Sequence, residues 1–167
     1  MDNQQAKSLF NLGWLIGMIE GEGWIILAKQ LLPSKNYRYV PVIGMNTTSS
    51  TLKDKFVEIV KENDIGVWVG YRESQNRKWK NQHQINIRGF KRCLKLLNLI
   101  IPYLEYKKPQ AELVKEYIEY RFKVHTENTS RKFIPPTGEK DESFRTRLMQ
   151  MNEKGKSFND YTPNTKM

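Results

Sequence analysis

The most constraining feature of the sequence is an apolar segment that ends abruptly in two glutamates. Ser8 to Ile19 reads SLFNLGWLIGMI and is apolar on nearly every face, which is typical of a helix covered on more than one side. Gly13, Gly17 and Gly21 recur every four residues, so they lie along one stripe of that helix. Because glycine costs a helix roughly 1 kcal/mol relative to alanine, we expect close contact along the stripe to compensate.

The predicted helix ends in Glu20-Gly21-Glu22-Gly23. Carboxylates at a helix C-terminus face the negative end of the helix dipole and cost a few tenths to about 1 kcal/mol unless a cation compensates. Hard divalent cations prefer carboxylate and carbonyl oxygens, which Glu22 and Gly21 can supply within one turn. The residues therefore predict a metal site at this helix end.

The rest of the pattern predicts two β-hairpins and further amphipathic helices. Strands are expected at 23–32, 37–47, 67–72 and 82–88, and helices at 51–63, 90–101, 111–124 and 144–151. In the last strand Ile85 and Ile87 alternate with Gln84, Asn86 and Arg88, so one face is apolar and the other polar. We expect one core domain over residues 1–125 and a polar extension over 126–167, packed peripherally or partly flexible.

Charge and cysteine content narrow the classes of function. The net charge of +10 favours a polyanionic partner, although charge alone fits a solvated basic surface equally well. A single cysteine, Cys93, excludes a disulfide within the chain and a thiolate metal cluster, and it favours a reducing compartment. We expect no membrane anchor and an intracellular location, in a prokaryotic cytoplasm or an organelle matrix.

The string LIGMIEGEG, residues 15–23, resembles the LAGLIDADG motif, with apolar, small and acidic residues in register. The order of predicted elements over residues 8–124 is also similar to that family. The resemblance implies an α+β, αββαββα fold whose curved four-stranded antiparallel sheet forms a DNA-binding saddle, followed by C-terminal helices. A single motif implies a homodimer. The interface residues implied are Gly13, Leu15, Ile16, Gly17 and Glu20.

The resemblance also implies an activity, that of a site-specific, intron-encoded homing endonuclease making a double-strand break in a long pseudo-palindromic DNA target. Glu22 and the carbonyl of Gly21 would hold Mg²⁺, or Mn²⁺ or Ca²⁺ in its place. Lys53 and Lys107 stand where the family often has basic residues that assist catalysis, and Ser49 stands where it usually has a longer polar residue. These four side chains and that carbonyl form the expected catalytic set.

The sheet strands and their loops supply candidates for reading DNA, because Arg suits guanine, Gln and Asn suit adenine, and Lys suits phosphate. They are Gln30, Lys35, Arg38, Tyr39, Asn46, Tyr71, Arg72, Arg77, Lys78, Gln82, Gln84, Asn86 and Arg88. The alternation is clean only in the last strand. In the first hairpin a slip of one residue would exchange the two faces.

Two other functions fit the same sequence. A basic sheet would also serve an RNA-binding splicing maturase that acts on intron RNA, and a DNA-binding regulator could keep the scaffold without cutting. Metal-dependent nicking of duplex DNA distinguishes the endonuclease from both.

Overall fold

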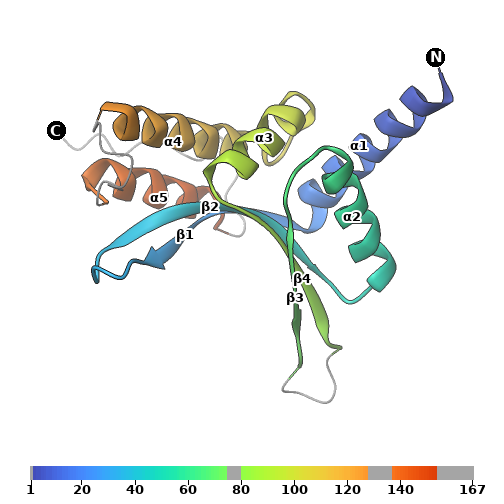
Figure 1. Ribbon diagram of the computed structural model, residues 1–167, viewed down its shortest axis with the longest axis horizontal. Helices are drawn as coiled ribbons and strands as arrows, with labels where there is room; N and C mark the ends of the chain where they lie inside the picture. Colours follow the sequence, from blue (N-terminus) through green and yellow to red (C-terminus); the bar gives the residue numbers. More distant parts are fainter. Residues whose placement is uncertain (1, 75–79, 128–136, 154–167) are drawn as a thin grey trace.

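The computed structural model describes residues 2–74, 80–127 and 137–153, and within them the chain forms five α-helices and a four-stranded sheet (Figure 1). The elements are α1 (Asn3–Glu22), β1 (Gly23–Leu31), β2 (Tyr37–Thr47), α2 (Ser50–Glu62), β3 (Trp68–Arg72), β4 (Gln82–Arg88), α3 (Phe90–Ile100), the short 3-10 helix η1 (Ile101–Tyr103), α4 (Lys108–Glu127) and α5 (Glu139–Met151). The predicted α+β class is confirmed.

The sheet has the order β1-β2-β4-β3, and every neighbouring pair is antiparallel. Ile25 pairs with Ile43, and Ile43 with Ile87, so these side chains share one face. All three isoleucines are buried under the helices. The two hairpins diverge, which gives the sheet a strong curvature and leaves its other face uncovered by helices (Figure 1).

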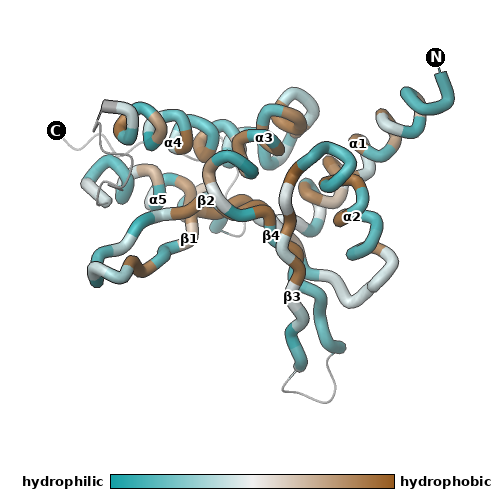
Figure 2. The backbone as a smooth tube through the Cα atoms, viewed as in Figure 1, coloured by the Kyte–Doolittle hydropathy of each residue, from teal (hydrophilic) through white to brown (hydrophobic). Residues whose placement is uncertain are grey.

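One hydrophobic core joins the sheet to the helices. Leu15 and Ile19 of α1, Phe56 of α2 and Val114 of α4 are all fully buried in it. Hydrophobic residues concentrate in the middle of the sheet, whereas the N-terminal end of α1 is hydrophilic (Figure 2). Within the described residues, no helix combines the length and the apolar run that crossing a bilayer requires.

The first helix begins earlier than its apolar pattern indicates. Asp2 is its N-cap, and the Asp2 carboxylate accepts a hydrogen bond from the Gln4 backbone N–H at 3.3 Å. The residues from Asn3 to Phe10 are exposed, so this part of α1 is helical without being buried in the chain. It projects beyond the body of the protein (Figure 1).

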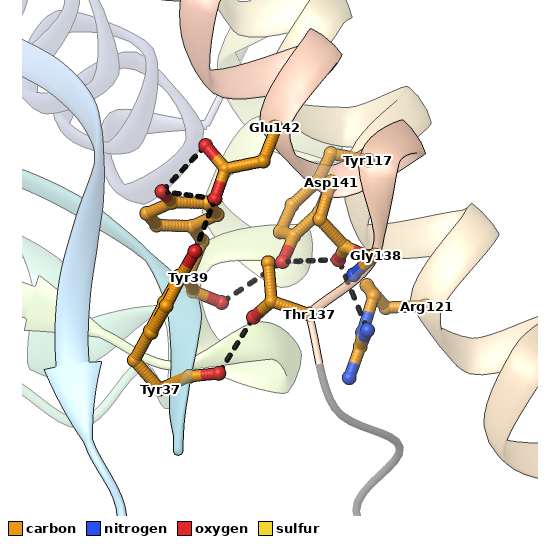
Figure 3. Close-up of polar contacts among 8 residues, drawn as sticks. All are labelled: Tyr37, Tyr39, Tyr117, Arg121, Thr137, Gly138, Asp141 and Glu142. Atoms are coloured by element: carbon orange, nitrogen blue, oxygen red, sulfur yellow. Dashed lines mark hydrogen bonds and ion pairs between the residues drawn. The ribbon is translucent and has the colours of Figure 1, made fainter. Parts of the chain in front are cut away.

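The C-terminal helix α5 is held to the core by polar contacts (Figure 3). The Asp141 carboxylate, almost fully buried, lies 3.0 Å from the Arg121 guanidinium and 3.1 Å from the Tyr117 hydroxyl. The neighbouring Glu142 accepts hydrogen bonds from the Tyr37 and Tyr39 hydroxyls at 2.6 and 2.8 Å. These bonds lower the pKa of Glu142 below its ordinary value. Sequence patterning predicted only the second half of α5, because its first turns are polar and docked by such contacts.

We predict that Arg121→Leu destabilises the fold by about 3–5 kcal/mol, since it leaves the Asp141 carboxylate buried without the guanidinium. Urea denaturation measures the loss. Adding Asp141→Asn to the same variant removes the buried charge and should recover part of it. Equal losses in the single and double variants would show that the ion pair is not the source of the stability.

Candidate functional site

The end of α1 joins the sheet without a loop. Glu22 is the last residue of the helix and Gly23 the first of β1. The Gly23 backbone N–H points back to the carbonyl oxygens of Ile19 and Met18. A Cβ on residue 23 would lie 2.7 Å from the Ile19 carbonyl oxygen, so only glycine fits this tight junction.

Lys107 occupies the C-terminal end of α1. Its ammonium donates hydrogen bonds to the carbonyl oxygens of Ile19 at 2.7 Å and Glu20 at 2.5 Å. Burial lowers the pKa of Lys107, and the carboxylates of Glu20 and Glu22 oppose that shift. The cation that this helix end requires is therefore supplied, at least in part, by the chain itself, a contribution that sequence analysis had assigned to a metal.

Glu20 makes the reciprocal contact. Its carboxylate accepts hydrogen bonds from the backbone N–H groups of Glu105 at 2.8 Å, Tyr106 at 3.2 Å and Lys107 at 3.2 Å, just before α4 begins. A carboxylate at a helix N-terminus and an ammonium at a helix C-terminus are both favourable. Glu20 thus anchors a loop of its own chain. The sequence had suggested only a contact with a second subunit for this residue.

Glu22 differs from Glu20 although only one residue separates them. Its side chain is exposed, and it has no hydrogen bond or ion pair with the part of the chain that the structure describes. Gly21 is exposed beside it, with open space where a Cβ would stand. One carboxylate and the Gly21 carbonyl are hard oxygen donors, so this donor set fits a divalent cation whose other ligands come from outside the chain.

Ser49 and Lys53 lie at the start of α2. The Ser49 hydroxyl caps the helix by accepting a hydrogen bond from the Leu52 N–H at 3.3 Å. Lys53 is half-buried and its ammonium lies 2.8 Å from the Asp54 carboxylate. Both side chains therefore have a local structural partner, and their catalytic roles stay predictions.

The glycine stripe of α1 is open. Added Cβ atoms at Gly13 and Gly17 would meet nothing within 4 Å among the described residues. Ile16 is half-buried next to the stripe. The prediction for Leu15 is corrected, because Leu15 is fully buried in the core of its own chain and has no surface to offer a partner.

The uncovered face of the sheet carries most of the predicted DNA-reading residues. Cross-strand register places on it Gln30, Arg38, Asn46, Arg72, Gln82, Gln84, Asn86 and Arg88. Arg38 is already ordered there, since its Nε donates to the Gln30 side-chain oxygen at 3.1 Å. Lys35 lies in the exposed turn between β1 and β2 with a positive φ of 61°.

Two tyrosines of the predicted set require correction. Tyr39 lies on the helix-covered face, is 2% exposed and hydrogen-bonds Glu142, so it cannot reach DNA. Tyr71 is exposed but pairs with His83 on the opposite face from Arg72. Tyr39 was assigned to the wrong face because the sequence of the first hairpin left its register ambiguous by one residue. Arg77 and Lys78 lie outside the described residues.

The sequence patterns did not identify Trp24 and Trp68, which also lie on the uncovered face. Trp24 pairs with Gly44, Gly44 with Asn86 and Asn86 with Trp68. The alternation around Asn86 predicts which residues of β4 lie on this face. It could have placed Trp24 and Trp68 there only if the pairing of the strands had been known.

Searches by sequence give no match: no family model fits the chain, and no curated protein is similar to it. Structural comparison does. The archaeal intron-encoded homing endonuclease I-Vdi141I, in complex with DNA, superposes with a TM-score of 0.62 at 18% identity, covering 92% of this chain and 89% of that chain.

The fold is that of the LAGLIDADG homing endonucleases. The homing endonuclease I-CvuI also matches, in complex with the I-CreI target and 2 mM Mg with the DNA not cleaved, at a TM-score of 0.55 and 17% identity. That match covers 87% of this chain and 96% of I-CvuI. I-CvuI in complex with its own target and 2 mM Ca superposes with a TM-score of 0.56 at 16% identity. That match covers 87% of this chain and 97% of I-CvuI. The LAGLIDADG fold expected from residues 15–23 is confirmed.

The two glutamates at the end of α1 should respond differently to truncation. Glu20→Ala removes the acceptor of three backbone N–H groups and should cost about 1–3 kcal/mol of stability. Glu22→Ala removes an exposed carboxylate and should change stability by less than about 0.5 kcal/mol. Thermal or urea denaturation of both variants tests this. Similar losses at the two positions would refute the division of roles.

Proposed function

We propose that the chain is a site-specific homing endonuclease that makes a double-strand break in a long pseudo-palindromic DNA target by metal-dependent phosphodiester hydrolysis. The observation that carries the proposal is the position of Glu22, an exposed carboxylate where α1 meets a sheet whose free face bears amide and guanidinium groups. I-CvuI and I-Vdi141I share the fold and are described with bound DNA, and I-Vdi141I as intron-encoded. We propose the same partner and genetic origin for this chain.

The charge and the free face of the sheet support duplex DNA as the partner. A net charge of +10 favours association with phosphates, and binding of this kind weakens steeply as salt rises. Amide and guanidinium groups on a curved sheet can reach base edges in the major groove. Arg77 and Lys78, which lie outside the described residues, stay in the proposed contact set with Lys35.

Glu22 and the Gly21 carbonyl are the groups we propose to hold a divalent cation, Mg²⁺ or a relative such as Mn²⁺ or Ca²⁺. When bound, the cation supplies Lewis-acid polarisation of the scissile phosphate and a lower pKa for the attacking water. The chain's own contribution is positional. Lys107 holds the end of α1 through the carbonyls of Ile19 and Glu20, so the Glu22 backbone is fixed before DNA arrives.

We further propose that two copies associate through the open stripe of α1, around Gly13 and Gly17. The stripe is uncovered in the described chain, so a second helix can approach it closely. A two-fold axis there would bring two Glu22 residues together, one for each DNA strand, and would match a pseudo-palindromic target. A single subunit could provide only one such carboxylate.

Glu22→Gln should reduce cleavage at least about 100-fold, the scale on which one preorganised charge-stabilising group acts, while DNA binding stays nearly unchanged. A target selected from a cleavage library with the wild-type protein and Mg²⁺ supplies the substrate, and gel shift measures binding.

Lys108→Gln serves as the matched control, because Lys108 is exposed at the start of α4 and has no proposed role. Parallel loss of binding and cleavage in Glu22→Gln would contradict its assignment as a metal ligand. Binding to intron RNA without any metal-dependent cutting of duplex DNA would favour the splicing function instead.

Gly17→Leu should convert the dimer to monomer or aggregate. Because open space surrounds this position in the single chain, the larger side chain should not disturb the monomer fold. Asn98→Leu adds the same side chain at an exposed position of α3 and should leave assembly unchanged. Sedimentation velocity reports the oligomeric state, and a persistent dimer in Gly17→Leu would exclude this stripe as the interface.

A further inference from the structure

A row of four residues crosses the uncovered face of the sheet from edge to edge. Trp24 of β1 pairs with Gly44 of β2, Gly44 pairs with Asn86 of β4, and Asn86 pairs with Trp68 of β3. Directly paired residues point to the same face. One amide therefore stands between two indole rings in the middle of the face proposed to bind DNA.

Gly44 lets the side chains on either side of it approach each other. A Cβ at Gly44 would lie 2.5 Å from the Asn86 side-chain oxygen and 3.1 Å from the Trp24 ring, so both side chains lean over the glycine. The same Cβ would lie 2.3 Å from the Ile85 carbonyl oxygen, so a larger residue would clash with the backbone as well as with these side chains. The Asn86 amide and the Trp24 ring therefore both approach the bare backbone of Gly44 from neighbouring strands.

Gly70 has the same effect on the other side of the row. A Cβ at Gly70 would lie 2.2 Å from the nearest atom of the Trp68 ring, so this indole lies across the glycine on its own strand. Trp68 is nevertheless 54% exposed. A large aromatic side chain is therefore spread over the sheet surface, half of it open to a partner.

We propose that this row reads A·T base pairs in the major groove. Asn86 would bind the N6 and N7 edge of adenine with its amide, and the exposed ring of Trp68 would contact thymine methyl groups. The inference rests on the proposed function, since it assigns part of the target recognised by that face. In this proposal the row makes apolar and amide contacts to base edges. Such contacts distinguish one base pair from another, whereas contacts to phosphate do not.

The neighbouring row of residues on this face differs in chemistry and should favour a different base pair. There Ile26 pairs with Val42, and Val42 with Arg88, whose guanidinium suits guanine. The Trp24-Gly44-Asn86-Trp68 row contains no charged side chain. Bases facing these two adjacent rows should therefore differ, with A·T opposite the row that contains Asn86.

The experiment first enriches duplexes from a randomised library by gel shift with the wild-type protein. The enriched duplex is then made in two forms, with thymine or with deoxyuridine at the conserved A·T positions, so that the two differ only in methyl groups. Wild type, Trp68→Ala, Asn86→Ala and Val69→Ala are compared on both. Val69 is the control, because it is exposed on the opposite face of β3.

Removing one contacted methyl should weaken wild-type binding about fourfold, as expected for one buried methylene-sized group, and Val69→Ala should behave as wild type. Trp68→Ala should bind both forms equally. Asn86→Ala should lose about 5-fold or more of the preference for adenine over guanine at one position. Wild-type protein that binds the deoxyuridine form as tightly as the thymine form, or Trp68→Ala that still distinguishes them, would overturn the inference. Failure to enrich or cut any duplex would instead overturn the proposed function and, with it, this assignment.

Discussion

The arrangement at the end of α1 depends on an exchange of charges between two helix ends. The Glu20 carboxylate lies at the C-terminus of α1, where the helix dipole disfavours negative charge. It accepts hydrogen bonds from three backbone N–H groups just before α4 begins. The Lys107 ammonium, from the start of α4, binds the carbonyl groups at the end of α1. Each group is unfavourable on its own helix and favourable on the other, so the two contacts stabilise the same packing.

This exchange gives the two glutamates different chemistry. Glu20 is committed to the loop before α4, whereas Glu22 extends beyond the contacts that Lys107 makes and stays exposed. Because α1 continues directly into β1, the position of Glu22 relative to the sheet is fixed by the Gly23 junction and by the pairing of Gly23 with Met45. A nuclease needs this property if the bond it cuts is to lie at a constant distance from the bases it reads.

Local patterns predicted the elements well, while contacts between distant segments escaped them. Alternation in residues 84–88 identified both faces of β4, because Ile85 and Ile87 are in the core whereas Gln84, Asn86 and Arg88 lie on the other face. Tyr39 was misassigned because its strand is buried on both faces, which removes the alternation. The start of α4 next to Glu20 could not be foreseen either, because 85 residues separate Glu20 from Glu105 and no periodicity links them.

The open stripe of α1 is the remaining feature that the isolated chain does not explain. Glycine destabilises a helix interior by roughly 1 kcal/mol per residue relative to alanine, and the described chain places nothing against Gly13 or Gly17 that would offset this cost. The same helix extends beyond the core with Leu9 and Phe10 exposed, at 54% and 67%. Open glycines and exposed apolar side chains along one helix are both stabilising only when a close-packed neighbour covers them, and this supports assembly through α1 independently of the resemblance to dimeric nucleases.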